Sequence, residues 1–296
     1  MQRLYICDKM FKQFSKGAVA MKVETVDLYE YFNFSKPKDT KGLLTIYALD
    51  NNSETGLKRE RSAMLVIPGG GYTFVSSREG ESVAISYVSR GIQSFVLDYS
   101  TGPSFVYPVH LREAAMAMIF IRENAKKYHV DPETVGCIGF SAGGHLCGCL
   151  GNAFNSPDIA DLRNCDFVRP TAIILSYPVT VYSPEIHSHR GSFINLTAGN
   201  HELAKTLALD KLVTKLSSPA FMWHTVTDEL VPVYGTIELS RVYHDHNVPF
   251  ELHLFANGQH GLSIATDEVN SPNESVQPWF DLSVTWLKSR GFKIYS

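Results

Sequence analysis

The chain has 296 residues, of which 44% are hydrophobic and 19% charged, with 27 basic and 30 acidic side chains. This composition excludes an intrinsically disordered chain and suits one large α/β domain or two smaller ones. The net charge of −3 gives no support for a nucleic-acid-binding protein.

The N-terminal region and the cysteines indicate the compartment. Residues 1–20 form a weakly patterned extension, and its charged residues interrupt the apolar run that a signal peptide needs. The longest apolar run, 114–121, is far shorter than the ~20 residues that cross a bilayer. Five cysteines without Cys-x-x-Cys or zinc-like spacing favour free thiols. We therefore expect a cytoplasmic protein with no membrane span, whose native start is Met1 or Met21.

From about residue 24, strand-like and helix-like segments alternate along the chain. The predicted strands are short apolar runs rich in β-branched or aromatic residues: 43–49, 63–67, 94–97, 135–138, 172–175, 220–224 and 250–255. Apolar residues between 111 and 125 recur at the three- and four-residue spacing of a helix, and further helices are expected after Ser141, over 233–244 and over 276–289. This alternation predicts a mostly parallel, doubly wound sheet.

Two segments fit the alternation poorly. Residues 151–168 and 180–216 contain many polar and charged side chains between the predicted strands. We expect them to be insertions over the strand ends that form a small cap. No linker or repeat divides the rest, so residues 21–296 are expected to form a single domain after an extension over 1–20.

The sequence Gly139-Phe140-Ser141-Ala142-Gly143-Gly144 contains a G-x-S-x-G motif. A predicted strand precedes it and a predicted helix follows it, which is the setting that a nucleophile elbow requires. Its glycines leave room for a serine on a tight turn. A serine that merely caps an ordinary helix is the alternative, but the context favours Ser141 as a nucleophile.

A serine hydroxyl needs a base and a carboxylate that orients the base. In the elbow architecture these follow the serine in the order acid, then histidine, each after a later strand. Asp228 follows the predicted strand 220–224, and Glu229 and Asp245 are rival carboxylates. Glu229 is one residue late for the turn, and Asp245 lies at the end of a helix. We therefore assign Asp228 as the acid.

The base is expected after the strand 250–255, where Gly258-Gln259-His260-Gly261 follows. Other histidines are less well placed: His253 lies inside a strand, His224 precedes the acid turn, and a helix carries His145 away from the serine. We assign His260 as the base and expect no metal ligation and no cofactor.

The third component is a site for the oxyanion that forms during acyl transfer. Gly69-Gly70-Gly71 follows a predicted strand at Pro68, where a second backbone donor should lie. The first donor is the N–H group of Ala142, and the second belongs to Gly70 or Gly71. The run fits no phosphate-binding glycine pattern.

These motifs resemble those of the α/β-hydrolase superfamily, in the branch of acetyl-xylan-esterase-like carbohydrate esterases. The matching stretches begin at about residue 24 and continue to the C-terminus: Pro68-Gly69-Gly70-Gly71-Tyr72, Gly139–Leu146, Ser176-Tyr177-Pro178-Val179, Phe221–Thr225 and Gly258–Leu262. The resemblance implies an α/β-hydrolase fold with nucleophile Ser141, acid Asp228 and base His260. Many related lipases have histidine where this chain has Pro68, a difference that is compatible with a sugar esterase.

The function expected from the sequence is hydrolysis of short-chain, above all acetyl, esters on sugars or xylo-oligosaccharides. We thus expect the protein to bind a small-molecule ester and to bind neither nucleic acid nor a membrane. The sequence does not decide whether it forms a homo-oligomer. A peptidase of the same superfamily and a non-catalytic small-molecule receptor are the alternatives. Covalent labelling of Ser141 by a fluorophosphonate would separate the enzymes from the receptor.

Overall fold

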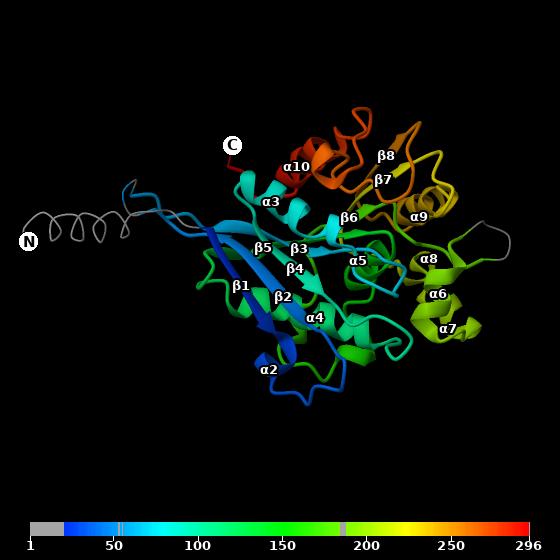
Figure 1. Ribbon diagram of the computed structural model, residues 1–296, viewed down its shortest axis with the longest axis horizontal. Helices are drawn as coiled ribbons and strands as arrows, with labels where there is room; N and C mark the ends of the chain where they lie inside the picture. Colours follow the sequence, from blue (N-terminus) through cyan, green and yellow to red (C-terminus); the bar gives the residue numbers. More distant parts are fainter. Residues whose placement is uncertain (1–20, 53, 55, 184–187, 296) are drawn as a thin grey trace, which may run out of the picture.

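The computed structural model describes residues 21–52, 54, 56–183 and 188–295. The expected N-terminal extension and part of the second expected insertion therefore lie outside the described residues. Within the described ranges, eight strands form one sheet in the order β1-β2-β4-β3-β5-β6-β7-β8 (Figure 1). The strands are β1 (Met21–Asp27), β2 (Leu43–Leu49), β3 (Arg61–Ile67), β4 (Gln93–Asp98), β5 (Val130–Phe140), β6 (Ile173–Ser176), β7 (Ala220–Thr225) and β8 (Phe250–Phe255).

The sheet is mostly parallel, as the sequence predicts. Strands β4, β3, β5, β6, β7 and β8 pair in parallel, whereas β1 and β2 add antiparallel neighbours at one edge. This is the α/β-hydrolase fold. Because the central strands are parallel, their carboxyl ends lie along one edge of the sheet, where ligand sites of such sheets form.

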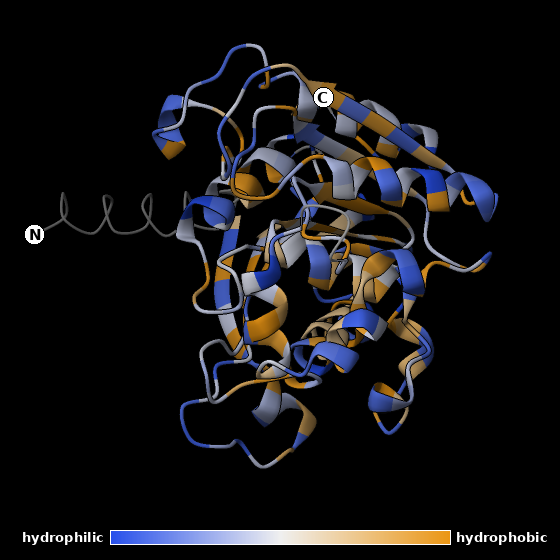
Figure 2. Cartoon of the chain, turned by 90° about the vertical axis from the view of Figure 1, so that its right-hand side faces the viewer, coloured by the Kyte–Doolittle hydropathy of each residue, from blue (hydrophilic) through white to orange (hydrophobic). Residues whose placement is uncertain are grey.

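Helices cover both faces of the sheet. The side chains of β3 are all buried and alternate between two cores: Leu65 belongs to one, and Met64 and Val66 to the other. The first core includes residues of α2 (Leu28–Phe32), α4 (Val109–Glu123), α5 (Ala142–Asn152), α8 (Leu209–Leu212) and α9 (Tyr234–Asp245), and the second includes residues of α3 (Glu81–Ser89) and α10 (Trp279–Ser289). The helices carry both hydrophobic and hydrophilic residues (Figure 2), as expected for elements with one face on a core.

Several elements were not expected from the sequence. Helix α3 packs the buried residues Val83, Ala84, Tyr87 and Val88 against the sheet. Residues 180–216 contain α6 (Arg190–Thr197) and α7 (His201–Leu207) as well as α8. Short 3₁₀ turns occur at η1 (Ser77–Glu79), η2 (Pro157–Ile159), η3 (Cys165–Phe167) and η4 (Asp267–Val269). No helix within the described ranges has the length and apolar character of a membrane span.

Candidate active site

Ser141 lies in the sharp turn between β5 and α5, with φ of 54° and ψ of −118°. Two glycines make this turn sterically accessible. A Cβ atom at Gly139 would lie 2.1 Å from the carbonyl oxygen of Gly143, and one at Gly143 would lie 2.2 Å from that of Ile67. The expected nucleophile elbow is therefore present, and its strained turn holds the Ser141 hydroxyl at the carboxyl edge of the sheet.

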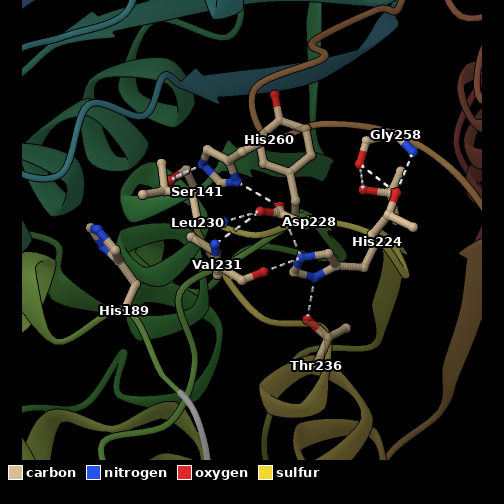
Figure 3. A network of polar contacts seen from close by, with 12 residues as sticks. Ser141, His189, His224, Asp228, Leu230, Val231, Thr236, Gly258 and His260 are labelled. Atoms are coloured by element: carbon tan, nitrogen blue, oxygen red, sulfur yellow. Dashed lines mark hydrogen bonds and ion pairs between the residues drawn. The ribbon is translucent and has the colours of Figure 1, made fainter.

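His260 follows β8 and faces this serine (Figure 3). Its Nε2 atom is 2.8 Å from the Oγ atom of Ser141, and its Nδ1 atom is 2.6 Å from the Oδ2 atom of Asp228. The structure thus brings together three residues that are far apart in the sequence and were assigned separately. The distances allow the hydroxyl proton to pass to the imidazole.

Asp228 is buried in the turn after β7. Its Oδ1 atom accepts hydrogen bonds from the backbone N–H groups of Leu230 (3.0 Å) and Val231 (2.9 Å). Burial alone raises the pKa of this carboxyl, but the hydrogen bonds from His224, His260 and Val231 outweigh burial and hold the pKa well below its usual range. Since an ionised carboxylate only accepts, Nδ1 of His260 carries the proton and Nε2 is left to accept from Ser141.

The rival carboxylates lie elsewhere. Glu229 is exposed, although it is adjacent to Asp228 in the chain. Asp245 ends α9 and forms an ion pair with Arg241 at 2.5 Å. Within the described ranges, neither carboxylate is hydrogen bonded to His260. The geometry therefore favours Asp228, the acid that was predicted from its position after a strand.

The expected oxyanion donors lie beside the serine. Gly70 and Gly71 have φ angles of 127° and 62° and line the same cavity as Ser141. Their N–H groups, and that of Ala142 at the start of α5, donate to no acceptor in the described part of the chain. The side chain of Asn195 donates to the carbonyl oxygen of Gly71 at 2.8 Å, which orients the loop. These N–H groups are available to a substrate oxygen.

The cavity above Ser141 has a volume of about 450 Å³. Phe74 and Leu230 form apolar parts of its wall, and both side chains are exposed. His189 and Asn195 provide a polar part. Burial and the proximity of His260 lower the pKa of His189, while Asp228 opposes this effect. The cavity therefore combines apolar and polar surfaces.

The two expected insertions contribute differently to this cavity. Residues 180–216 supply His189, Gly191 and Asn195 to its lining, whereas no residue of 151–168 lies there. Side chains of 151–168 bind to α4 instead: Asp161 pairs with Arg112 at 2.6 Å, and Asn164 donates to Glu123 at 2.6 Å. Asp161 and Asn164, expected above Ser141, are thus directed to α4, where basic and acidic partners are available.

His224 is a residue of the site that the sequence analysis set aside. It is fully buried in β7, and its Nε2 atom lies 3.2 Å from Oδ2 of Asp228 and 2.8 Å from the carbonyl oxygen of Val231. No local pattern separates this histidine from an ordinary strand residue. Its role depends on the turn after β7, which folds Asp228 back onto the strand.

The described residues contain no group of three or more His, Cys, Asp or Glu side chains that could hold a metal ion. The arrangement of Ser141, His260, Asp228 and the free N–H groups can perform acyl transfer with the chain's own residues.

Comparisons with known proteins point to one family. A family model described as BD-FAE matches residues 49–243. The chain is 37% identical over 219 residues to endo-1,4-beta-xylanase B of Butyrivibrio fibrisolvens, covering 71% of this chain and 34% of that protein. It is 26% identical over 257 residues to an acetylxylan esterase of Xylanibacter ruminicola, covering 84% of this chain and 49% of that protein. The chain therefore spans about a third to a half of the curated relatives that it matches.

Solved structures are similar over nearly the whole length of both chains. An acetyl ester-xyloside bifunctional hydrolase from Caldicellulosiruptor lactoaceticus has a TM-score of 0.78 and 34% identity, over 91% of this chain and 97% of that one. The carboxylesterase Cest-2923 from Lactobacillus plantarum has a TM-score of 0.78 and 29% identity, over 92% and 98%. The chain thus shares its fold with these two hydrolases.

Proposed function

The chain belongs to the BD-FAE family and has the α/β-hydrolase fold, and from this premise we propose that it is a serine esterase that hydrolyses short-chain, above all acetyl, esters on sugars or xylo-oligosaccharides. One observation carries the chemical part of this proposal. Ser141, His260 and Asp228 are joined by contacts of 2.8 and 2.6 Å beside free backbone N–H groups. The names of the relatives support the substrate class, because they include an acetylxylan esterase and an acetyl ester-xyloside hydrolase.

The acylation step follows from the geometry. The Oγ atom of Ser141 attacks the ester carbonyl carbon while Nε2 of His260 takes the hydroxyl proton. The carbonyl oxygen becomes an oxyanion that the N–H groups of Ala142 and of Gly70 or Gly71 stabilise. Asp228 stays ionised and stabilises the imidazolium, because its pKa is held low. The tetrahedral intermediate then expels the sugar alkoxide, which receives the proton from His260.

Deacylation repeats these steps with water. His260 takes a proton from a water molecule, whose oxygen attacks the acyl carbon on Ser141. Collapse of the second tetrahedral intermediate breaks the ester bond to Ser141, and His260 returns the proton to its Oγ atom. The products are the free alcohol and the carboxylic acid.

The substrate preference rests on the mixed lining of the cavity. His189 and Asn195 can form hydrogen bonds with sugar hydroxyl groups, whereas Phe74 and Leu230 supply apolar contacts. A long acyl chain gains only ~0.8 kcal/mol for each buried methylene and needs a continuous apolar wall. The polar residues interrupt such a wall, so short acyl groups are favoured.

A series of p-nitrophenyl esters with two to twelve acyl carbons, with acetylated xylo-oligosaccharides alongside, tests the proposal. We expect kcat/KM to be highest for acetyl or propionyl esters and expect acetate to be released from the oligosaccharides. A maximum at eight carbons or beyond would overturn the sugar-ester assignment and leave a lipase-like esterase.

A cytoplasmic location is the remaining part of the proposal. Four described cysteines, Cys137, Cys147, Cys149 and Cys165, are free thiols, and the first three are buried. Free thiols are typical of proteins in reducing compartments. Fractionation of cells that produce the protein, with activity measured in each fraction, tests this location.

A further inference from the structure

A buried carboxylate connects the two loops that complete the active site. Glu79, at the end of η1, is only 3% exposed. Its Oε2 atom accepts a hydrogen bond from the backbone N–H group of Gly69 at 2.7 Å, and its Oε1 atom accepts one from the hydroxyl group of Tyr177 at 2.6 Å. Gly69 immediately precedes the two glycines that are expected to bind the oxyanion.

Tyr177 extends this connection to the histidine loop. Its hydroxyl oxygen accepts a hydrogen bond from the backbone N–H group of Ser263 at 2.9 Å, three residues after the base. Its ring also contacts the imidazole of His260 edge-on, with the ring centroids 5.0 Å apart. A single tyrosine thus touches the ring of the base and holds the backbone of the loop that carries it.

The segment around Tyr177 also holds the nucleophile. The N–H group of Ser141 donates to the carbonyl oxygen of Ser176 at 3.0 Å, and the N–H group of Val179 donates to that of Ser141 at 3.0 Å. Tyr177 itself has a φ angle of 37°, an uncommon value for a residue other than glycine. Its conformation is therefore imposed by its surroundings, at the point where the elbow and both loops meet.

Glu79 uses both of its carboxyl oxygens as hydrogen-bond acceptors. Both groups that bind these oxygens are donors: the backbone N–H group of Gly69 and the hydroxyl group of Tyr177. A glutamine at this position would place an NH₂ group against one of them. Either Gly69 would face another donor, or the hydroxyl proton of Tyr177 would lose its acceptor. Buried donors without a partner are costly, so the loops would shift to find new ones.

We propose that Glu79 and Tyr177 form a positioning pair that sets the oxyanion loop at a fixed distance from the histidine loop, for the ester hydrolysis proposed above. Neither residue donates or accepts the reacting proton. Their effect is on preorganisation, because backbone donors stabilise an oxyanion only when they already point at its position. A displacement of about 1 Å in such a site can reduce the rate by about 10²-fold.

The test compares Glu79→Gln, Tyr177→Phe and the double variant with wild type. The measurements are kcat and KM for p-nitrophenyl acetate, the rate constant for labelling by a fluorophosphonate, and the melting temperature. We expect each single variant to lose roughly 10- to 100-fold in kcat and in labelling rate, with KM within about threefold. The double variant should lose no more than the worse single variant, because both changes break one connection.

Glu113 and Tyr29 provide matched controls. Glu113 is a buried carboxylate on α4 that accepts hydrogen bonds from the N–H group of Ser100 at 2.7 Å, from the hydroxyl group of Ser100 at 2.5 Å and from the hydroxyl group of Tyr29 at 3.0 Å. It has the same kind of partners as Glu79, but it contacts neither of the two loops. Glu113→Gln and Tyr29→Phe should lower the melting temperature and keep kcat within about twofold of wild type.

Folded Glu79→Gln and Tyr177→Phe variants that keep kcat and the labelling rate within about twofold of wild type would overturn the positioning role. Losses that multiply in the double variant would also overturn it. Tyr177→Phe removes only a hydroxyl group and decides the matter if Glu79→Gln does not fold. A wild-type protein that reacts with the fluorophosphonate but hydrolyses no ester would refute the proposed function, while the labelling rates would still judge the positioning pair.

Discussion

The Nε2 atom of His224 lies 3.2 Å from Oδ2 of Asp228, the same oxygen that receives the hydrogen bond from His260. This Nε2 atom is also 2.8 Å from the carbonyl oxygen of Val231. A carbonyl oxygen only accepts, so Nε2 of His224 carries a proton and donates, while Nδ1 lies 2.8 Å from the hydroxyl oxygen of Thr236. The buried imidazole therefore supports both the acid and the turn that holds it.

Replacing His224 should impair the acid without removing it. In His224→Phe, Asp228 and Val231 lose a buried donor, and hydrogen bonds to charged groups contribute about 1.5–3 kcal/mol each. We expect kcat to fall roughly tenfold, KM to change little and the melting temperature to fall. Steady-state kinetics and thermal unfolding measure these effects. His253→Phe is the control, since His253 on β8 contacts only the nearby Glu251 carboxylate among the described polar groups; an equal loss of kcat there would contradict the role of His224.

Ser141→Ala should abolish hydrolysis and leave the fold intact. Only a small hydroxyl group is lost, and removal of a triad member typically reduces kcat by several orders of magnitude. Hydrolysis of p-nitrophenyl acetate and fluorophosphonate labelling measure the loss, and circular dichroism checks the fold. Retention of more than about a tenth of the wild-type activity would show that Ser141 is not the nucleophile.

Asp228→Asn should reduce kcat far more than Glu229→Gln. The Asp228 carboxylate fixes the proton of His260 on Nδ1, whereas an amide can stabilise the wrong tautomer and reduce kcat by about 10⁴-fold in a related arrangement. Glu229 is exposed, and its substitution should change kcat less than about twofold. The two variants are compared on the same acetyl ester. A reversed order of severity would transfer the role of the acid to Glu229.

The low pKa of Asp228 predicts how its contribution to stability depends on pH. A carboxyl group whose pKa is depressed in the folded state stabilises the fold above its unfolded pKa, about 4, and this stabilisation is lost as the pH falls below that value. The difference in unfolding free energy between wild type and Asp228→Asn should therefore shrink as the pH falls below about 4. Urea unfolding followed by tryptophan fluorescence measures it. A difference in unfolding free energy that increases as the pH falls below about 4 would contradict this prediction.

His189 should affect sugar esters more than simple esters. Its Nδ1 atom lies 2.9 Å from the Oγ atom of Ser192, and no described residue is hydrogen bonded to its Nε2 atom. The residue lines the cavity, so Nε2 can bind a hydroxyl group of the substrate. In His189→Ala we expect KM for acetylated xylo-oligosaccharides to rise roughly fivefold, which corresponds to the ~1 kcal/mol of one hydrogen bond.

Two comparisons make this result specific to the sugar. For His189→Ala, kcat/KM for p-nitrophenyl acetate should stay within about twofold of wild type, because that leaving group offers no hydroxyl groups. His244→Ala, at an exposed position near the end of α9, should leave both substrates unaffected. Equal losses on both esters would place His189 in the support of the triad and not in sugar binding.

The elements that carry the proposed chemistry were readable from the sequence, because their signals are local. A buried parallel strand is a continuous apolar run, a nucleophile elbow needs glycines at fixed spacing, and Asp228 and His260 each follow a strand directly. Parallel strands bring their carboxyl ends to one edge, so residues 87 and 119 positions from Ser141 could be assigned to one site.

Contacts between segments that are distant in the sequence could not be predicted from such local signals. The connection from Gly69 through Glu79 and Tyr177 to Ser263 joins four segments, and no local pattern distinguishes Glu79 from an exposed glutamate on a helix start. Likewise, 151–168 and 180–216 looked alike as polar insertions, but only the second reaches the cavity. Local periodicity and turn chemistry thus determined seven of the eight described strands, all but β1, together with the elbow and the order of the triad. The tertiary structure decided which buried polar groups face one another, because each buried donor must find its acceptor on whichever distant segment the folded sheet places beside it.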